Sequence, residues 1–300
     1  MFKLFEDWLE NKWESRVLVI TAGAGMGKTG IMSKLVRSRT DTVLAHHFCR
    51  HDDSRKRDPK HVLCSIAYQI SLSIPAYRTA LESLGLKREE LYGQDMNTTA
   101  LFHKILCEPL GMVENSFSKR QIILIDALDE CDHDGKNDLL SCIRDHFLEL
   151  PSWIGFFMTT RPEVNIITAL SKFHPEPLVA DSEKSMKDIC LFLRNSLVRC
   201  LSEEELDEGV ELLGKKSKGV FIYARYAVEK LNPQDTASLE DLRNFPDGIT
   251  GFYDIQFKRI LGENYENIGA KTPTWRIIEA VMAAREPLHV KALDYLVTCT

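Results

Sequence analysis

Eight consecutive residues have the composition and spacing of a phosphate-binding loop. In order they are Ala22, Gly23, Ala24, Gly25, Met26, Gly27, Lys28 and Thr29. The glycines allow backbone N–H groups to surround phosphate oxygens, Lys28 places a positive charge on the β- and γ-phosphates, and Thr29 offers a hydroxyl to Mg²⁺. The strict pattern begins with Gly, and many such loops accept Ala at that position. The sequence therefore predicts a P-loop that binds a nucleoside triphosphate with Mg²⁺.

Acidic residues for the other half of such a site follow a buried apolar run. The run is Ile122-Ile123-Leu124-Ile125 and it ends at Asp126, which we expect to hold Mg²⁺ beside the P-loop. Asp129 and Glu130 come three and four residues later, and a carboxylate there could orient and deprotonate the attacking water. We favour Asp129 for this role and keep Glu130 as the alternative. Both are also typical of acids near a helix start.

A cation stands at the end of the next apolar run, in the segment Thr159-Thr160-Arg161-Pro162-Glu163. Because loops at the carboxyl ends of parallel strands converge on the ligand, Arg161 could face the γ-phosphate and sense its presence. The alternative is a structural ion pair with Glu163 or Asp129.

A metal site is the less favoured interpretation of the histidines. His47, Cys49 and His51 would share one face of a strand, but no second group of ligands has zinc spacing, so packed or surface histidines are expected. The eight cysteines form no CxxC pair, which indicates free thiols.

The elements that position these residues alternate along the chain. Apolar runs typical of buried parallel strands are expected at residues 16–21, 42–48, 121–126, 153–160 and 176–181, with helices between them at 28–37, 59–73, 98–106 and 137–148. From Ser182 onward only helical periodicity is present. The fold class predicted is α/β: a P-loop NTPase parallel sheet flanked by helices, followed by a small helical domain.

Four regions follow from this pattern. They are a flanking helix (1–16), a P-loop nucleotide-binding domain (17–181), a small helical domain (182–264) and the start of a further domain (265–300). Helical pattern continues to Thr300, so we expect the chain to be a piece of a longer protein.

Composition narrows the class of protein. With 300 residues, 44% of them hydrophobic, the chain can bury a large core, and its net charge of −6 gives no reason to expect nucleic-acid binding. No apolar run reaches the roughly 18–20 residues of a membrane span, and the start lacks a signal peptide. We expect an intracellular, cytoplasmic, soluble protein.

The ordered set of motifs resembles the NACHT class of STAND ATPases, signal-transducing relatives of AAA+ proteins. The extended strand from Ile122 to Glu130 is the strongest match, and Thr159–Glu163 is similar to the family's sensor-1 segment. Further similar segments are His46–Cys49, Ser65–Gln69, Gly219–Ala224, Pro246–Ile249 and Arg285–Leu288.

The resemblance implies a winged-helix domain beginning near 265 and an ATP-operated switch. In such proteins a closed ADP form exchanges nucleotide, opens and self-associates, and repeats or effector domains outside the segment seen here bind the protein partners. We therefore predict slow, Mg²⁺-dependent ATP hydrolysis coupled to a conformational change.

Two other functions stay open. One is a nucleotide-stabilised interaction scaffold with little or no turnover, against which the acids at 126, 129 and 130 argue. The other is a kinase or GTPase, but no Asn-Lys-x-Asp stretch for guanine follows a later strand, so ATP is favoured over GTP.

Overall fold

The computed structural model describes residues 2–10, 15–93, 96–114, 117–131, 136–180, 182–231, 237–262, 273–284 and 288–298. The chain divides into two compact units, Met1–Val179 and Ala180–Thr300. The expected ends of the second and third regions, Asp181 and Asn264, lie outside the described residues.

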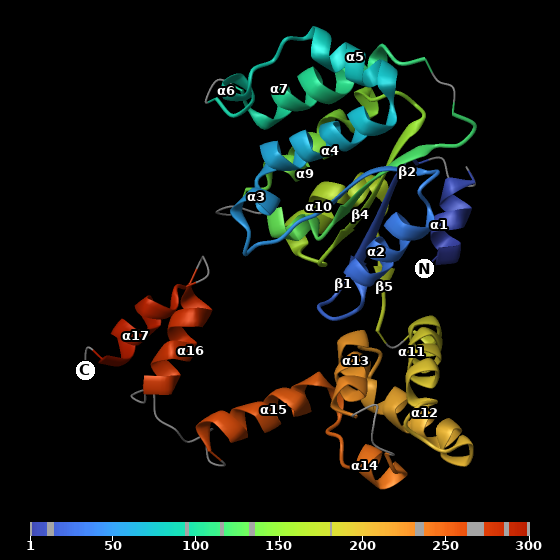
Figure 1. The fold of residues 1–300 in the computed structure, drawn as a ribbon, viewed down its shortest axis with the longest axis vertical. Helices are drawn as coiled ribbons and strands as arrows, with labels where there is room; N and C mark the ends of the chain where they lie inside the picture. The colour runs from blue at the N-terminus through green and yellow to red at the C-terminus, as the bar shows by residue number, and fades with distance from the viewer. Residues whose placement is uncertain are drawn as a thin grey trace. The chain divides into compact units, whose positions relative to one another are not determined.

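The first unit is built on a five-stranded sheet whose paired strands are all parallel (Figure 1). The strands are β1 (Val17–Ala22), β2 (Val43–Phe48), β3 (Gln121–Asp126), β4 (Ile154–Thr160) and β5 (Glu176–Leu178), in the order β2-β3-β4-β1-β5. Strands β1, β3 and β4 are buried along their whole length, which explains their nearly continuous apolar sequences. The predicted α/β fold class is confirmed.

Both faces of the sheet are covered by helices because successive side chains of a strand point to opposite faces. Leu18, Ile122 and Leu124 pack on one face against α1 (Phe2–Leu9) and α2 (Lys28–Ser38). Val19, Ile123 and Ile125 belong to the core on the other face, which takes in the larger helical layer of Figure 1. The principal helices of that layer are α4 (Pro59–Ser73), α5 (Pro75–Ser83), α7 (Thr98–Phe102), α9 (Asp138–His146) and α10 (Val164–Leu170).

Short helical segments connect these elements. They are α3 (Ser54–Arg57), α6 (Arg88–Leu91), η1 (His103–Cys107), α8 (Glu108–Gly111), η2 (Leu128–Cys131), η3 (Phe147–Glu149) and η4 (Ser171–Phe173). The helix predicted for residues 59–73 and the strand predicted for 121–126 have those bounds. The helix predicted for 98–106 instead changes to a π-helix at His103, a distinction that apolar spacing does not make.

The second unit is helical throughout its described residues. Its helices are α11 (Glu183–Leu197), α12 (Glu203–Ser217), α13 (Phe221–Lys230), α14 (Leu239–Arg243), α15 (Gly248–Leu261), α16 (Pro273–Ala283) and α17 (Val290–Thr298). Leu193, Tyr223 and Phe252 lie in the core formed by α11 to α15. The Tyr223 hydroxyl donates to the Pro246 carbonyl (2.6 Å), which ties α13 to the turn before α15. Residues 285–287, part of a motif used for the resemblance, lie outside the described residues, and the winged-helix assignment stays a prediction.

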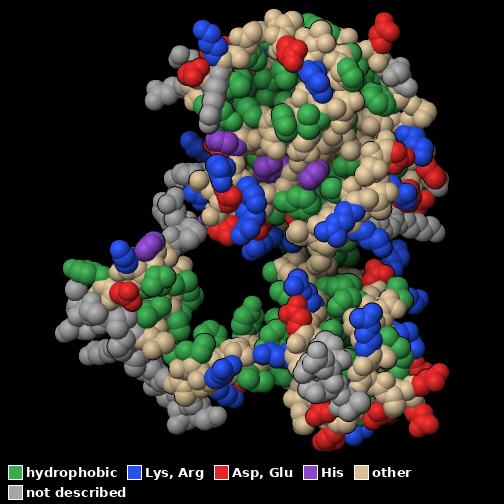
Figure 2. Space-filling model, viewed as in Figure 1, with side chains coloured by type: hydrophobic (Ala, Val, Ile, Leu, Met, Phe, Trp, Pro, Cys, Tyr) green, Lys and Arg blue, Asp and Glu red, His purple; other side chains and the backbone are tan. Residues whose placement is uncertain are grey.

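The surface carries mixed charge. On the face shown in Figure 2, acidic and basic side chains are interspersed over the first unit, and apolar side chains appear among them near α4, α5 and α7. Among the described residues, no helix is long and apolar enough to cross a membrane.

Candidate nucleotide site

The glycine-rich loop connects β1 to α2, as the sequence predicts. Gly25 (φ 75°) and Gly27 (φ 88°) have left-handed backbone conformations, which explains why these two positions require glycine. Helix α2 begins directly at Lys28. The Lys28 ammonium donates to the carbonyls of Ala22 (2.6 Å) and Gly23 (3.0 Å), so it lies over the loop and not along the helix surface.

The order of the strands brings the predicted site segments together. Strand β4 lies between β1 and β3, with Ile20 of β1 opposite Thr159 and Ile125 of β3 opposite Met158. The carboxyl ends of the three strands therefore lie side by side at one edge of the sheet. We call this the carboxyl edge, and it is where ligands of open α/β sheets bind.

Three side chains from these three segments form a hydrogen-bonded cluster, in which Asp126 and Thr159 are buried and Thr29 is exposed. The Thr29 hydroxyl donates to Oδ2 of Asp126 (2.6 Å), and the Thr159 hydroxyl donates to Oδ1 (2.5 Å). The Ala127 N–H in turn donates to the Thr159 hydroxyl (3.0 Å). Asp126 is 2% exposed and Thr159 is 1% exposed, so their polar side-chain atoms depend on these hydrogen bonds within the protein. The P-loop threonine and the predicted Mg²⁺ ligand are thus in direct contact.

Thr159 lies near the end of β4, two residues before Arg161, and its contact with Asp126 has a testable consequence. We expect Thr159→Val to lower the free energy of unfolding by about 1–3 kcal/mol, because it leaves the Ala127 N–H and one Asp126 oxygen without a partner. Thr159→Ser, which keeps the hydroxyl, is the matched control. Urea unfolding measures the effect, and equal midpoints for the Val and Ser variants would contradict it.

The chain turns sharply after Asp126 and places two more acids near β4. Ala127 has a left-handed conformation (φ 55°), and Leu128 begins the 3-10 helix η2 that contains Asp129. Asp129 accepts from the Arg161 backbone N–H (2.9 Å) and lies 3.2 Å from the Arg161 Nε. Both of its oxygens thus contact Arg161. The ion pair with Asp129 that the sequence left as an alternative for Arg161 is present.

Glu130 has a more open environment than Asp129. One of its oxygens accepts from the His51 backbone N–H (3.0 Å), and the other lies 3.9 Å from an Arg161 nitrogen. The Glu130 side chain is 29% exposed, whereas that of Asp129 is 4% exposed and that of Arg161 is 50% exposed. A carboxylate that activates water needs an oxygen open to that water, so the exposure favours Glu130 over Asp129 for this role. The choice between them stays a prediction.

The charges of the site act on Lys28. Burial lowers the pKa of Lys28; the positive charge of Arg161 acts in the same direction, and Asp129, Asp126 and Glu130 act in the opposite one. All the charged residues predicted for the site therefore lie near enough to Lys28 to influence its ammonium.

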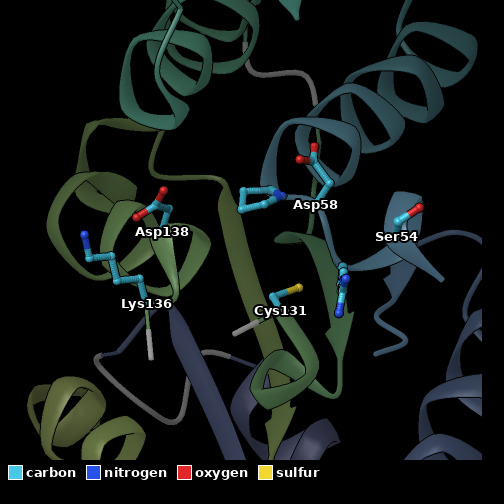
Figure 3. Close-up of a pocket in the computed structure, with 7 residues that line it drawn as sticks. Ser54, Asp58, Cys131, Lys136 and Asp138 are labelled. Carbon is cyan, nitrogen blue, oxygen red and sulfur yellow. The ribbon is translucent and has the colours of Figure 1, made fainter. Parts of the chain in front are cut away.

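A cavity of about 440 Å³ is lined by residues of α3, η2 and the starts of α4 and α9 (Figure 3). It is lined by Ser54, Arg57, Asp58, Pro59, Cys131, Lys136 and Asp138. The P-loop residues and Asp126 are not among these lining residues, so the cavity is distinct from the predicted phosphate site. The sulfur of Cys131 lies 3.1 Å from that of Cys49, and the hydrogen bond between them, together with burial, raises the pKa of the Cys49 thiol.

A glycine-rich loop between β1 and α2, an acid at the end of β3 and a parallel sheet covered on both faces define a P-loop NTPase nucleotide-binding module. The chain belongs to the family described as "Nephrocystin 3, N-terminal", whose profile matches residues 3–161, more than half of the 300 residues. Every predicted site residue lies in the matched segment. The resemblance to NACHT-type P-loop NTPases is confirmed.

A curated relative covers nearly the whole chain. It is vegetative incompatibility protein HET-E-1 of Podospora anserina, 24% identical over 313 aligned residues that include 98% of this chain. The alignment takes in 22% of that relative, so this chain spans less than a quarter of its length.

Solved structures with some likeness are distant. The Aeropyrum pernix ORC1 protein in complex with DNA has a TM-score of 0.45 at 14% identity, covering 95% of this chain and 76% of that one. The FIGL-1 AAA domain has a TM-score of 0.36 at 12% identity, covering 99% of this chain and 80% of that one. The fold assignment rests on the sheet described above and not on these scores.

Proposed function

We propose that this chain binds ATP with Mg²⁺ and hydrolyses it slowly, as the nucleotide-operated part of a signalling switch. The observation that carries the proposal is the contact of Thr29 with Asp126 at the carboxyl edge, directly after a glycine-rich loop. Oxygen atoms from two segments 97 residues apart are brought within 2.6 Å of each other there.

The donor set fits Mg²⁺. Thr29 offers a hydroxyl oxygen and Asp126 a carboxylate, and Mg²⁺ prefers such hard oxygen ligands, often through water. Thr159 keeps the Asp126 carboxylate oriented from the opposite side. Bound Mg²⁺ would supply positive charge on the phosphate oxygens, and Thr29 and Asp126 would hold it.

The phosphates would lie in the loop from Ala22 to Thr29. The N–H groups of the loop and of the first turn of α2 would face the phosphate oxygens, and α2 is 11 residues long, so its N-terminus favours negative charge. Lys28 would move its ammonium from the carbonyls of Ala22 and Gly23 onto the β- and γ-phosphates.

Hydrolysis requires a water molecule oriented toward the γ-phosphate. We assign that role to Glu130, whose side chain is the more exposed of the two acids, and we assign Asp129 to hold Arg161. Arg161 would respond to the γ-phosphate by exchanging its carboxylate partners for phosphate oxygens. Such an exchange would give ATP and ADP different effects on the segment after β4.

The switch would consist of a change between the P-loop unit and the following small helical unit, residues 182–264, with the start of a winged-helix domain after it. Self-association in the ATP state and protein partners bound through repeats or effector domains of a longer protein belong to the same proposal. Nucleic acid has no part in it.

A second candidate is a scaffold that binds nucleotide without turning it over. The observation that favours it is that Arg161 pairs with Asp129 and lies 3.9 Å from Glu130, so the cation that would face the γ-phosphate already has carboxylate partners.

The experiment is to extract nucleotide from the purified chain and then to follow phosphate release from ATP and GTP in the presence of Mg²⁺. Co-purified ADP with slow release that depends on Lys28 supports the switch, and faster release from GTP than from ATP contradicts the choice of ATP. Tight binding without release supports the scaffold. A chain that neither contains nor binds nucleotide would disprove both.

A further inference from the structure

Three side chains with metal-binding atoms converge away from the carboxyl edge, and a fourth, His146, contacts one of them. The Nδ1 of His103 lies 3.1 Å from Oε2 of Glu149, and the Nδ1 of His146 lies 2.8 Å from Oε1 of the same residue. Ligand atoms of His103, Cys107 and Glu149 lie within 4.8 Å of one another. The two imidazole rings are 4.9 Å apart between centroids. One imidazole, one thiol and one carboxylate are thus gathered around one point, and His146 lies against the carboxylate and the His103 ring.

Two local spacings produce this cluster. His103 and Cys107 are four residues apart in the π-helix η1, and His146 and Glu149 are three residues apart where α9 passes into η3. Residues three or four apart in a helix lie on one face, so His103 lies beside Cys107 on one segment and His146 lies beside Glu149 on the other. π-Helical turns are rare and occur frequently at functional sites.

Hydrogen bonds made elsewhere fix the backbone of both segments. The buried Tyr77 hydroxyl donates to the Ile105 carbonyl (2.5 Å), midway between His103 and Cys107. On the other segment the Arg16 guanidinium donates to the carbonyls on both sides of Glu149, those of Leu148 (3.1 Å) and Leu150 (3.0 Å). The ligands are therefore held by anchored main chain, as a metal site requires.

The position of the cluster separates it from the nucleotide site. Arg16 directly precedes β1, so the segment that it binds lies at the amino ends of the strands. The P-loop and Asp126 lie at their carboxyl ends. A metal ion bound here would join η1 to the end of α9 and would stabilise the first unit without touching the nucleotide.

The chemistry of the cluster selects the type of ion. Mg²⁺ and Ca²⁺ prefer oxygen ligands only, whereas Zn²⁺ takes imidazole, thiolate and carboxylate together in a tetrahedron. With bonds of about 2.0–2.3 Å, the ligand atoms of such a tetrahedron are roughly 3.3–3.8 Å apart. The ligand atoms of His103, Cys107 and Glu149 lie within 4.8 Å of one another, so side-chain adjustments would bring them to that spacing. Glu149 and Glu108 also surround the Cys107 thiol with negative charge, which favours a cation.

The cluster can be reached from solvent. The side chain of Glu149 is 48% exposed and those of His103 and His146 are about one-third exposed. An ion could therefore enter without unfolding of the unit. We propose that His103, Cys107 and Glu149 form a zinc site that fastens the η1 segment to the end of α9, with water as the fourth ligand and with His146 hydrogen-bonded to Glu149.

The test uses the whole purified chain, freed of metal and then titrated with Zn²⁺ and with Co²⁺. We expect one ion per chain at this site, a raised melting temperature with Zn²⁺, and visible absorption of tetrahedral Co²⁺ together with a thiolate charge-transfer band. Cys107→Ser should remove the charge-transfer band and weaken binding at least about tenfold. Cys64→Ser, which changes another half-buried cysteine of the same unit, is the matched control. It should keep the charge-transfer band and the Zn²⁺ affinity of the wild type.

Glu149→Gln serves as the second variant. The Glu149 side chain is exposed, so the fold should tolerate its substitution. It should also weaken Zn²⁺ binding at least about tenfold while ATP binding through Lys28 is unchanged. Equal Zn²⁺ affinity in the wild type, Cys107→Ser and Glu149→Gln would overturn the proposal and leave the cluster as hydrogen bonds between histidines and Glu149. A failure of nucleotide binding in the wild type would bear only on the P-loop.

Discussion

Lys28→Ala should abolish ATP binding, with a loss of affinity of about 100-fold or more. The ammonium lies over the glycine-rich loop, 2.6 Å from the Ala22 carbonyl, and it is the charged donor that the loop itself provides for the phosphates. A charged hydrogen bond contributes roughly 1.5–3 kcal/mol, and a loss of about 2.8 kcal/mol corresponds to 100-fold. Isothermal titration with ATP and Mg²⁺ measures the effect.

Lys34→Ala is the matched control for this variant. Lys34 is exposed on the same helix, α2, but lies beyond the first turn that faces the loop, so its loss should leave affinity unchanged. Thermal unfolding of both variants checks that α2 and the sheet are intact. Micromolar affinity retained by a folded Lys28→Ala variant would show that the P-loop assignment is wrong.

Glu130→Gln should retain ATP binding and slow hydrolysis by about 100- to 1000-fold, the range expected for loss of a general base. The substitution keeps the size of the side chain and its contact with the His51 N–H, and it removes only the negative charge. Binding and single-turnover phosphate release measured on the same preparation separate the two effects.

Asp129→Asn is the informative comparison, since it changes the neighbouring acid in the same way. Because both Asp129 oxygens contact Arg161, we expect this variant to lower the stability of the first unit and to slow hydrolysis less than Glu130→Gln does. If Asp129→Asn has the larger effect on turnover, the buried acid is the base, as the sequence alone favoured. Glu163 is an exposed acid of the neighbouring segment. Glu163→Gln should change neither the stability of the first unit nor the rate of hydrolysis.

Local sequence was sufficient for the parts of the site that lie within one segment. The loop from Ala22 to Thr29 has a fixed spacing with a strand before it and a helix after it, and the structure has all three elements. Asp126 ends an unbroken apolar run, which identifies both the strand and its last residue. These features depend on backbone conformation and local burial, which residue type largely determines.

Contacts between distant segments could not be derived in the same way. The position of β4 between β1 and β3 places Thr159 against Asp126, and strand order is not encoded in the spacing of apolar residues. Near Glu149, two short pairs meet: His103 with Cys107, and His146 with Glu149. Neither pair indicates a metal site by itself, and about 40 residues separate them in the sequence. Only the packing of η1 near the end of α9 makes them one cluster.

The strand order also has a consequence for how the chain is made. Strand β1 pairs only with β4 and β5 among the described strands, and its Val17 lies opposite Phe156. At synthesis rates of about 5–20 residues per second, on the order of ten seconds pass before these partners leave the ribosome. Throughout that time six consecutive residues that are buried in the finished sheet have no strand to pair with. The phosphate-binding loop, although translated among the first residues, is therefore set in place among the last, and chaperone protection of the nascent chain should matter most in that interval.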